Sequence, residues 1–191
     1  MDGVELLTTT APAGQASFEQ VYEASFDFVY RNARRLGVPQ SATDDVVQEV
    51  FLVLYRRLAE YDGRASLRSW VYGILANTVR QYRRTFRRKQ KPLQPIERDE
   101  DLGPASSRAG PEQRAQHHRD VALLLSLLEE LPQEQRELIV LADLEQLSVP
   151  EICACIGGNS NTVHSRLRVA REALRGKLAR RLLTAERKER G

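Results

Sequence analysis

Residues 151–178 read EICACIGGNSNTVHSRLRVAREALRGKL, and this stretch decides the fold. Residues 151–156 form a short apolar helix pattern, residues 157–160 break it, and residues 161–178 begin a second helix with arginine at almost every exposed turn. Two helices joined by a tight glycine-containing turn, the second of them basic, are typical of a helix-turn-helix. A helix of this kind fits the major groove and reads base edges there, so the stretch predicts DNA binding.

The second of these helices has an apolar side that predicts burial of Val163, Leu167, Ala170 and Leu174. Its other side begins with small polar side chains and continues with arginines, which suit base edges and phosphates respectively. We expect the DNA contacts of this helix among Thr162, His164, Ser165, Arg166, Arg168, Arg171 and Arg175.

The charge of the 191-residue chain is unevenly distributed, although its formal net value is only +3. Residues 62–92 carry nine Lys/Arg against one Asp, a net of +8, and residues 161–190 carry ten against three acids, a net of +7. Residues 122–151 carry one Arg against seven acids, a net of −6. Two separated basic blocks indicate two contacts with a polyanion, the alternative being two solvated helix faces.

Helical periodicity recurs along the chain and no strand-like alternation interrupts it. The pattern predicts an all-α fold of two small helical domains, at 17–91 and 115–183, joined by a flexible linker at 92–114 that is rich in proline and glycine. Residues 1–16 are predicted to be a disordered leader and residues 184–191 a basic tail.

Caps and breaks predict the individual helices. Ser17 precedes the first, Ser41 or Thr43 can cap the second, which runs to about Leu58, and Ser66 caps a third that ends near Arg88. In the other domain the pattern predicts helices near 113–130, 133–144, 149–156 and 161–183, with Ser148 capping the third of these.

The helix expected near residues 44–58 has one apolar stripe and one mixed face. An exposed leucine among acids and an amide is typical of a surface that binds a partner, and an ordinary solvated face is the alternative. The residues of this face are Asp45, Gln48, Glu49, Leu52 and Arg56.

The helix expected from Ser66 has a polar face on which Asn77, Arg80, Gln81 and Arg84 follow at helical spacing. Amides and guanidinium groups together suit base edges and phosphates. On the same face Ser69, Gly73 and Ala76 are small enough to let a backbone or a base approach closely. Near the helix start, Trp70 and Tyr72 could stack on an unpaired base, or Trp70 could be a core aromatic.

No cofactor, metal or catalytic site is predicted. Cys153 and Cys155 are two positions apart on a helix and point to different faces, and His117 and His118 stand in a polar stretch. The chain shows no signal peptide and no apolar run of the ~20 residues that a membrane span needs. We therefore expect a cytoplasmic protein that does not insert stably into a membrane.

Three motifs in this order resemble the extracytoplasmic-function sigma factors, two-domain members of the bacterial sigma-70 family. DDVVQEVF at 44–51 resembles the helix that binds core polymerase, and SWVYGILAN at 69–77 resembles the segment that binds the −10 element. The domain that binds the −35 element is resembled by four short motifs: LP at 131–132, RE at 136–137, EI at 151–152 and TVHSRL at 162–167. The chain departs from the family pattern at Cys153, Asn161 and Val169.

The resemblance implies roles and partners that spacing alone does not. The helix with Gln48 and Glu49 would bind the β′ subunit of core polymerase, and the chain as a whole would contact both β′ and β. Tyr61, Arg64, Trp70 and Asn77 would help to open the −10 element. The residues named above on the 161–178 helix would read the −35 element, and an anti-sigma protein would mask both domains.

Alternatives to this function remain at the level of sequence. A helix-turn-helix regulator that is not a sigma factor would explain the second domain but not the basic helix with Trp70 and Asn77. A sigma mimic that only sequesters an anti-sigma protein should lack those basic and aromatic residues, and a helical hydrolase has no supporting cluster of side chains.

Overall fold

The computed structural model describes residues 17–89 and 110–189, and within these ranges every regular element is helical, which confirms the all-α prediction. The elements are α2 (Phe18–Arg35), α3 (Gln40–Arg57), η1 (Leu58–Glu60), α4 (Leu67–Lys89), α5 (Pro111–Glu129), α6 (Gln133–Ile139), η2 (Val140–Leu144), α7 (Val149–Ile156) and α8 (Ser160–Glu189). The predicted leader and most of the predicted linker lie outside the described residues.

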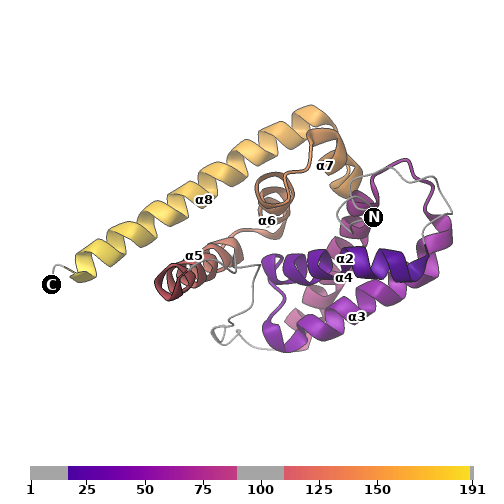
Figure 1. The fold of residues 1–191 in the computed structure, drawn as a ribbon. Helices are drawn as coiled ribbons and strands as arrows, with labels where there is room; N and C mark the ends of the chain where they lie inside the picture. The colour runs from indigo at the N-terminus through magenta and orange to yellow at the C-terminus, as the bar shows by residue number, and fades with distance from the viewer. Residues whose placement is uncertain (1–16, 90–109, 190–191) are drawn as a thin grey trace.

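Helices α2, α3 and α4 lie side by side and form the first half of the molecule, residues 17–89 (Figure 1). α2 begins at a capping box, in which the backbone N–H of Gln20 donates to Ser17 Oγ and the backbone N–H of Ser17 donates to Gln20 Oε1. α4 begins after Ser66, whose Oγ accepts a bond of 3.2 Å from the backbone N–H of Ser69. The apolar stripes bury Val21, Val29, Val50, Leu54, Val71 and Leu75.

The start of α3 differs from the prediction. The helix begins at Gln40, so neither Ser41 nor Thr43 is its cap, and Pro39 occupies the N-cap position without a side-chain bond. Proline fixes φ, here at −66°, and so directs the chain into the helix before the polar residues are reached. Thr43 lies inside the helix and its hydroxyl donates back to the carbonyl of Pro39 at 3.0 Å.

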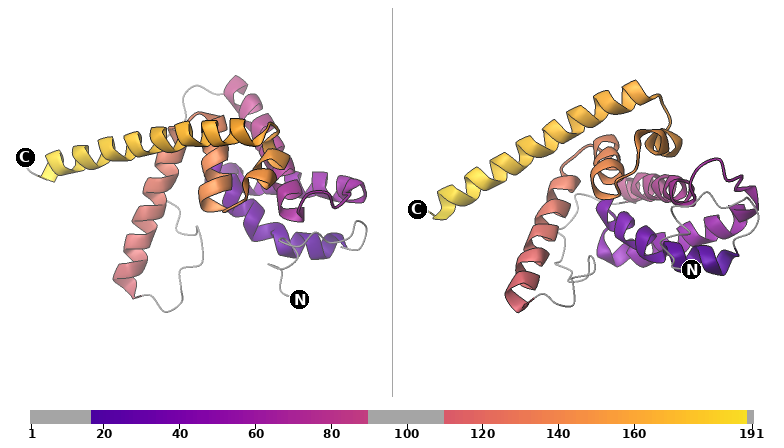
Figure 2. Two further views of the ribbon diagram at one scale, coloured as in Figure 1. Left: turned by 90° about the horizontal axis from the view of Figure 1, so that it is seen from above. Right: turned by 45° about the horizontal axis from the view of Figure 1, so that its top comes forward.

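The second half, residues 110–189, contains α5 to α8. α5 begins at Pro111, inside the predicted linker, because proline is suited to the first turn of a helix. α6 continues into the π-helical η2, and α8 extends to Glu189, so most of the predicted basic tail is helical. Figure 2 shows the end of α8 projecting beyond the other helices.

The two halves share one hydrophobic core, which the sequence pattern of two tethered domains does not predict. α7 lies against α4, and buried residues from both halves, such as Leu75 and Ile152, belong to the same cluster (Figures 1 and 2). This contact decides which functional side chains are accessible. Among the described helices none combines the length and apolar character that crossing a bilayer requires.

Candidate nucleic-acid interface

The turn before α8 is built by residues that suit its backbone. Gly157 and Gly158 have φ values of 76° and 98°, a region that glycine adopts without steric cost. Asn159 then caps α8, because its Oδ1 accepts from the backbone N–H of Thr162 at 2.9 Å and from the Thr162 hydroxyl at 3.1 Å. The sequence pattern identifies the glycines but not this cap.

The first turns of α8 present polar side chains to solvent. His164, Ser165, Arg166 and Arg168 are exposed and Thr162 is half-buried at the cap. Of the predicted inward residues, Val163, Leu167 and Ala170 are buried and Leu174 is half-buried. The whole predicted face is thus accessible at the start of the helix. Val169, also exposed, stands beside Arg168.

The later arginines of α8 are partly engaged within the second half. Arg171 binds both oxygens of Asp143 through Nε, each at 3.1 Å, and Arg175 donates to the carbonyl of Arg171 at 3.3 Å. Arg168 lies 3.8 Å from Glu172 on the exposed surface, where an ion pair contributes little. Arg166 and Arg168 are therefore more free to reorient toward DNA than Arg171.

The polar face of α4 is only partly open. Asn77, Gln81 and Arg84 are exposed, and Asn77 Oδ1 accepts from Arg80 Nη1 at 2.9 Å. Arg80 Nε also donates to Glu137 of the second half at 3.1 Å. The predicted face therefore exists, but one of its cations is already paired with a carboxylate.

The small residues of the same face, which were expected to let a backbone or a base approach closely, are covered by another part of the chain. Ser69 and Ala76 are buried, and a Cβ added to Gly73 would lie 4.0 Å from the carbonyl oxygen of Cys155. Small side chains do allow a close backbone approach here, but the backbone is that of α7. Cys155 Sγ donates to the carbonyl of Ser69 at 3.5 Å.

The aromatic residues near the start of α4 divide into a half-buried pair and a fully buried ring. Tyr61 and Trp70 stand with ring centroids 5.2 Å apart, and the Tyr61 hydroxyl donates to the carbonyl of Ala65 at 2.7 Å. Arg64 is exposed beside Asp62. Tyr72 is fully buried, so in this arrangement it offers no surface for a base.

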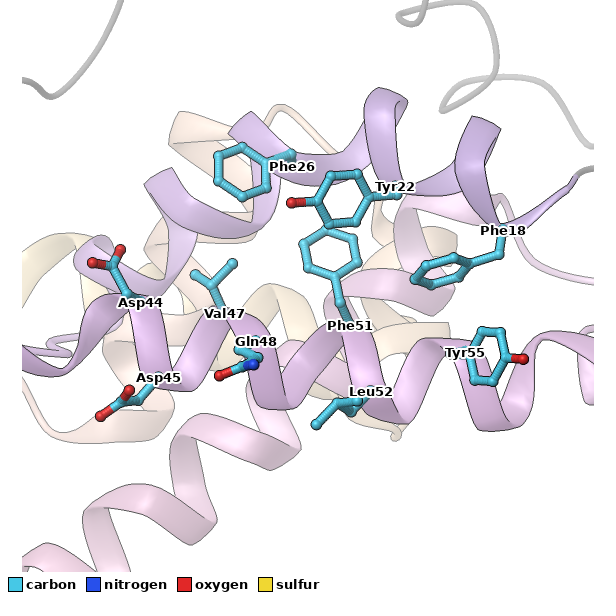
Figure 3. Close-up of a pocket in the computed structure, with 10 residues that line it drawn as sticks. All are labelled: Phe18, Tyr22, Phe26, Asp44, Asp45, Val47, Gln48, Phe51, Leu52 and Tyr55. Carbon is cyan, nitrogen blue, oxygen red and sulfur yellow. The ribbon is translucent and has the colours of Figure 1, made fainter.

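The predicted partner surface on α3 is exposed and borders a groove of about 540 Å³ that α2 completes (Figure 3). Tyr22 and Phe51 meet across the groove at 4.5 Å between centroids, and Phe18 meets Tyr55 edge-on at 5.2 Å. Leu52 is 44% exposed and Tyr55 66% exposed. The remaining residues predicted for this surface are exposed: Asp45, Gln48, Glu49 and Arg56. The α2 aromatics complete an apolar site that the α3 pattern alone does not predict.

Comparison with known proteins matches both halves of the chain to one family. Residues 21–89 match the Sigma-70 region 2 family and residues 122–174 match the Sigma-70, region 4 family. The sigma factor CnrH of Cupriavidus metallidurans is 32% identical over 178 residues, 91% of this chain and 93% of CnrH. The ECF sigma-E factor of Escherichia coli is 32% identical over 145 residues, 74% of this chain and 76% of that protein. The chain belongs to the extracytoplasmic-function sigma factors.

Solved structures resemble this sigma factor over most of its length. CnrH in complex with the cytosolic domain of CnrY has a TM-score of 0.63 at 26% identity, covering 93% of this chain and 98% of CnrH. RpoE of Bartonella quintana, solved with the anti-sigma factor NepR, has a TM-score of 0.66 at 21% identity, covering 85% of this chain and 96% of RpoE, and supports the fold alone.

Several charged residues of this sigma factor have contacts that sequence reasoning missed. Arg136 is buried and donates to the carbonyl oxygens of Leu128 at 2.6 Å, Glu129 at 2.6 Å and Leu36 at 2.8 Å, so it links the end of α5 to the end of α2. Burial lowers the pKa of Arg136 to about 10, which leaves it a cation at neutral pH. Glu145 is buried against the first half. The sequence signal for the Glu145 contact is the acidic stretch at 122–151.

Within residues 17–89 and 110–189, His, Cys, Asp and Glu side chains form no cluster of three or more suited to holding a metal ion. His117 and His118 are exposed on α5, with ring centroids 6.4 Å apart. Cys153 and Cys155 are both free thiols.

Proposed function

We propose that this sigma factor binds core polymerase through the α2–α3 groove, reads the −35 element with the start of α8, and opens the −10 element with α4 and the loop before it. The observation that carries the proposal is that one chain has two features: an apolar groove rimmed by acids, and a helix α8 whose first turns expose polar and basic side chains. A regulator needs only the second of these features.

Run-off transcription with purified core polymerase tests the function. We expect transcripts from a cognate promoter when only this chain and core are supplied. A regulator that is not a sigma factor would give transcripts only when another sigma factor is added, and that result would refute the proposal.

The groove is proposed as the site for the β′ subunit, and contacts to β are expected elsewhere on the chain. Apolar and aromatic side chains at the centre of a contact surface supply most binding energy, while the rim acids add specificity. Leu52 stands exposed at the edge of this groove, where a partner helix would bury it.

Leu52→Ala should weaken binding to core polymerase about tenfold, because an exposed apolar side chain that a partner buries is lost. Fluorescence anisotropy with labelled sigma factor would measure the affinity. Leu182→Ala is the matched control, because Leu182 is a leucine of similar exposure, 52%, near the far end of α8. Equal affinities of the two variants would rule out Leu52 as a contact.

Arg168→Ala should relax base choice at the −35 element, since one specific base contact is worth about 1–3 kcal/mol. A panel of promoter variants would show a loss of discrimination at one position. Asn77→Ala should instead leave −35 choice intact and reduce opening of the −10 element, which permanganate footprinting detects. Arg180→Ala, an exposed arginine farther along α8, is the control for a general loss of positive charge.

Control by an anti-sigma protein is part of the proposal. The support is the solved complex of CnrH, a relative that is 32% identical to this chain, with the cytosolic domain of CnrY. Co-purification with the product of a neighbouring gene and inhibition of run-off transcription by that product would test it.

A further inference from the structure

A buried carboxylate, Glu145, helps to join the two halves of the molecule. Glu145 is 3% exposed, and its oxygens accept hydrogen bonds from Asn32, at 3.0 Å, and from Arg35 and Arg68. Arg31 approaches the same carboxylate at 3.6 Å, so three guanidinium groups of α2 and α4 surround one acid of the second half. A cluster of this kind is an anion-binding site, because guanidinium groups bind carboxylates and phosphates through the same geometry.

A second acid of the second half reaches the α4 face directly. Glu137 is buried and accepts from Arg80 at 3.1 Å and from Gln133 at 2.9 Å. Arg83 donates to the same Gln133 and, at 3.2 Å, to the carbonyl of Leu36. The most acidic stretch of the sequence, 122–151, thus lies on the most basic part of the first half.

The contact covers part of one candidate DNA surface and leaves the other open. On α4, Ser69, Tyr72 and Ala76 are buried and Arg80 is paired, whereas His164 and Arg168 at the start of α8 are exposed. The free chain therefore presents its −35 surface, while the part of its −10 surface around Ser69, Ala76 and Arg80 is covered and Asn77, Gln81 and Arg84 stay exposed.

The contact is also imperfect in its hydrogen bonding. Asn32 Oδ1, Arg68 Nε and Tyr72 Oη are buried and have no hydrogen-bond partner within the described ranges. Buried polar groups of permanent interfaces are nearly always paired, because each unpaired group destabilises the buried state. These groups would regain partners in water, which favours a contact that opens.

We propose that Glu145 and Glu137 stand in for DNA phosphates in the free chain: they occupy an anion site formed by Arg31, Arg35, Arg68 and Arg80, and nucleic-acid phosphates displace them when α4 binds DNA. The site extends the DNA surface to Arg31, Arg35 and Arg68. The inference rests on the proposed function of α4. In the free chain the two carboxylates compete with DNA phosphates for the same arginines.

Cys155 reports on the contact, because its thiol lies between α7 and α4. Burial raises the pKa of the Cys155 thiol to about 11. While the two halves are in contact, the thiol is therefore both shielded from solvent and protonated, and each limits its reaction with dithionitrobenzoate. The assay uses the full chain with Cys153→Ala, which leaves Cys155 as the single thiol.

In this assay Glu145→Gln should speed labelling of Cys155 about tenfold, because the ion pairs that hold the two halves together at Glu145 are lost. The matched control is Glu130→Gln, whose partners Lys177 and Arg181 belong to the same half, and it should label at the parent rate. A short single-stranded oligonucleotide of arbitrary sequence should speed labelling of the parent toward the rate of Glu145→Gln.

A charge exchange excludes misfolding as the cause. Arg80→Glu and Glu137→Arg should each speed labelling, and the double variant should restore protection. Equal rates in all variants, or a double variant no slower than the single ones, would overturn the proposal. A rate that responds to Glu145→Gln but not to the oligonucleotide would also overturn it, because phosphate would then not compete for the site.

Run-off transcription with core polymerase separates the two hypotheses. Transcription without any change of labelling among the variants would leave the proposed function standing and refute the internal cover. Labelling that responds as expected in a chain that never supports transcription would refute the proposed function alone.

Discussion

Gln146 occupies a backbone conformation that glycine normally fills. Its φ is 55°, and it separates the buried residues Glu145 and Leu147 at the end of η2. The chain must turn sharply here so that Glu145 faces the first half and Leu147 N donates to the carbonyl of Leu141 at 2.9 Å. A side chain in this left-handed region costs about 1–2 kcal/mol relative to the ordinary helical region.

Gln146→Gly should therefore raise the free energy of unfolding by about 1 kcal/mol, because glycine adopts this conformation without the Cβ conflict. Urea unfolding followed by circular dichroism would measure the change. Gln146→Ala retains the Cβ and should give no such gain. A gain of the same size for alanine would show that the side chain, rather than the backbone, sets the cost.

Helix α8 depends on one cap for the geometry of its first turn. Asn159 bonds both the backbone and the side chain of Thr162, and the candidate base contacts His164 and Arg168 follow within two turns. An intact cap therefore holds the proposed −35 surface in shape as well as stabilising the helix.

Asn159→Ala should lower the free energy of unfolding by about 1 kcal/mol and weaken binding to −35 duplex DNA. Denaturant titration and fluorescence anisotropy would measure these two effects. Asn161→Ala, a change of another exposed asparagine in the same turn, is the control. Equal losses in the two variants would mean that the cap has no special role.

Most helices could be predicted from sequence because their signals are local. Ser17, Ser66 and Ser148 each stand before an apolar pattern and bond a group three residues ahead. The start of α3 could not be identified in this way, because Ser41 and Thr43 look like caps while Pro39 sets the entry. Local polarity also placed Ser69 and Ala76 on an open face, although a distant helix buries them.

At the scale of the whole molecule, the contact between the halves was not predictable from one sequence. Arg35 and Glu145 are 110 residues apart, and Arg80 and Glu137 are 57 apart. The opposite charges of 62–92 and 122–151 are visible in the sequence, but their value as partners depends on the three-dimensional path of the chain. The candidate DNA residues could be listed, yet their accessibility could not.

Alkaline pH should weaken the packed arrangement through Cys155. The thiol faces Ser69 and Glu151, and burial raises its pKa from 9.0 to about 11. The thiol ionises at a lower pH in the unfolded chain than in the folded one. Its contribution to the free energy of unfolding is therefore complete below pH 9. About 2 kcal/mol of it is lost as the pH rises to about 11. Burial also raises the pKa of Tyr72, which titrates with the same sign.

Comparison with Cys155→Ala isolates the thiol. Urea unfolding below pH 9 and near pH 11 should show a smaller loss for the alanine variant than for the parent. Identical losses in the two proteins would show that the thiol is not desolvated in solution.

The exposed start of α8, together with the proposed cover on α4, determines which part of a promoter the chain binds first. In the proposed arrangement, a chain that meets DNA while Glu145 and Glu137 still cover part of α4 binds the upstream −35 element first, and this binding raises the local concentration of downstream phosphates around Arg31, Arg35 and Arg68. Upstream anchoring would then precede strand separation, so a weak −35 element would slow the first step of initiation rather than the last.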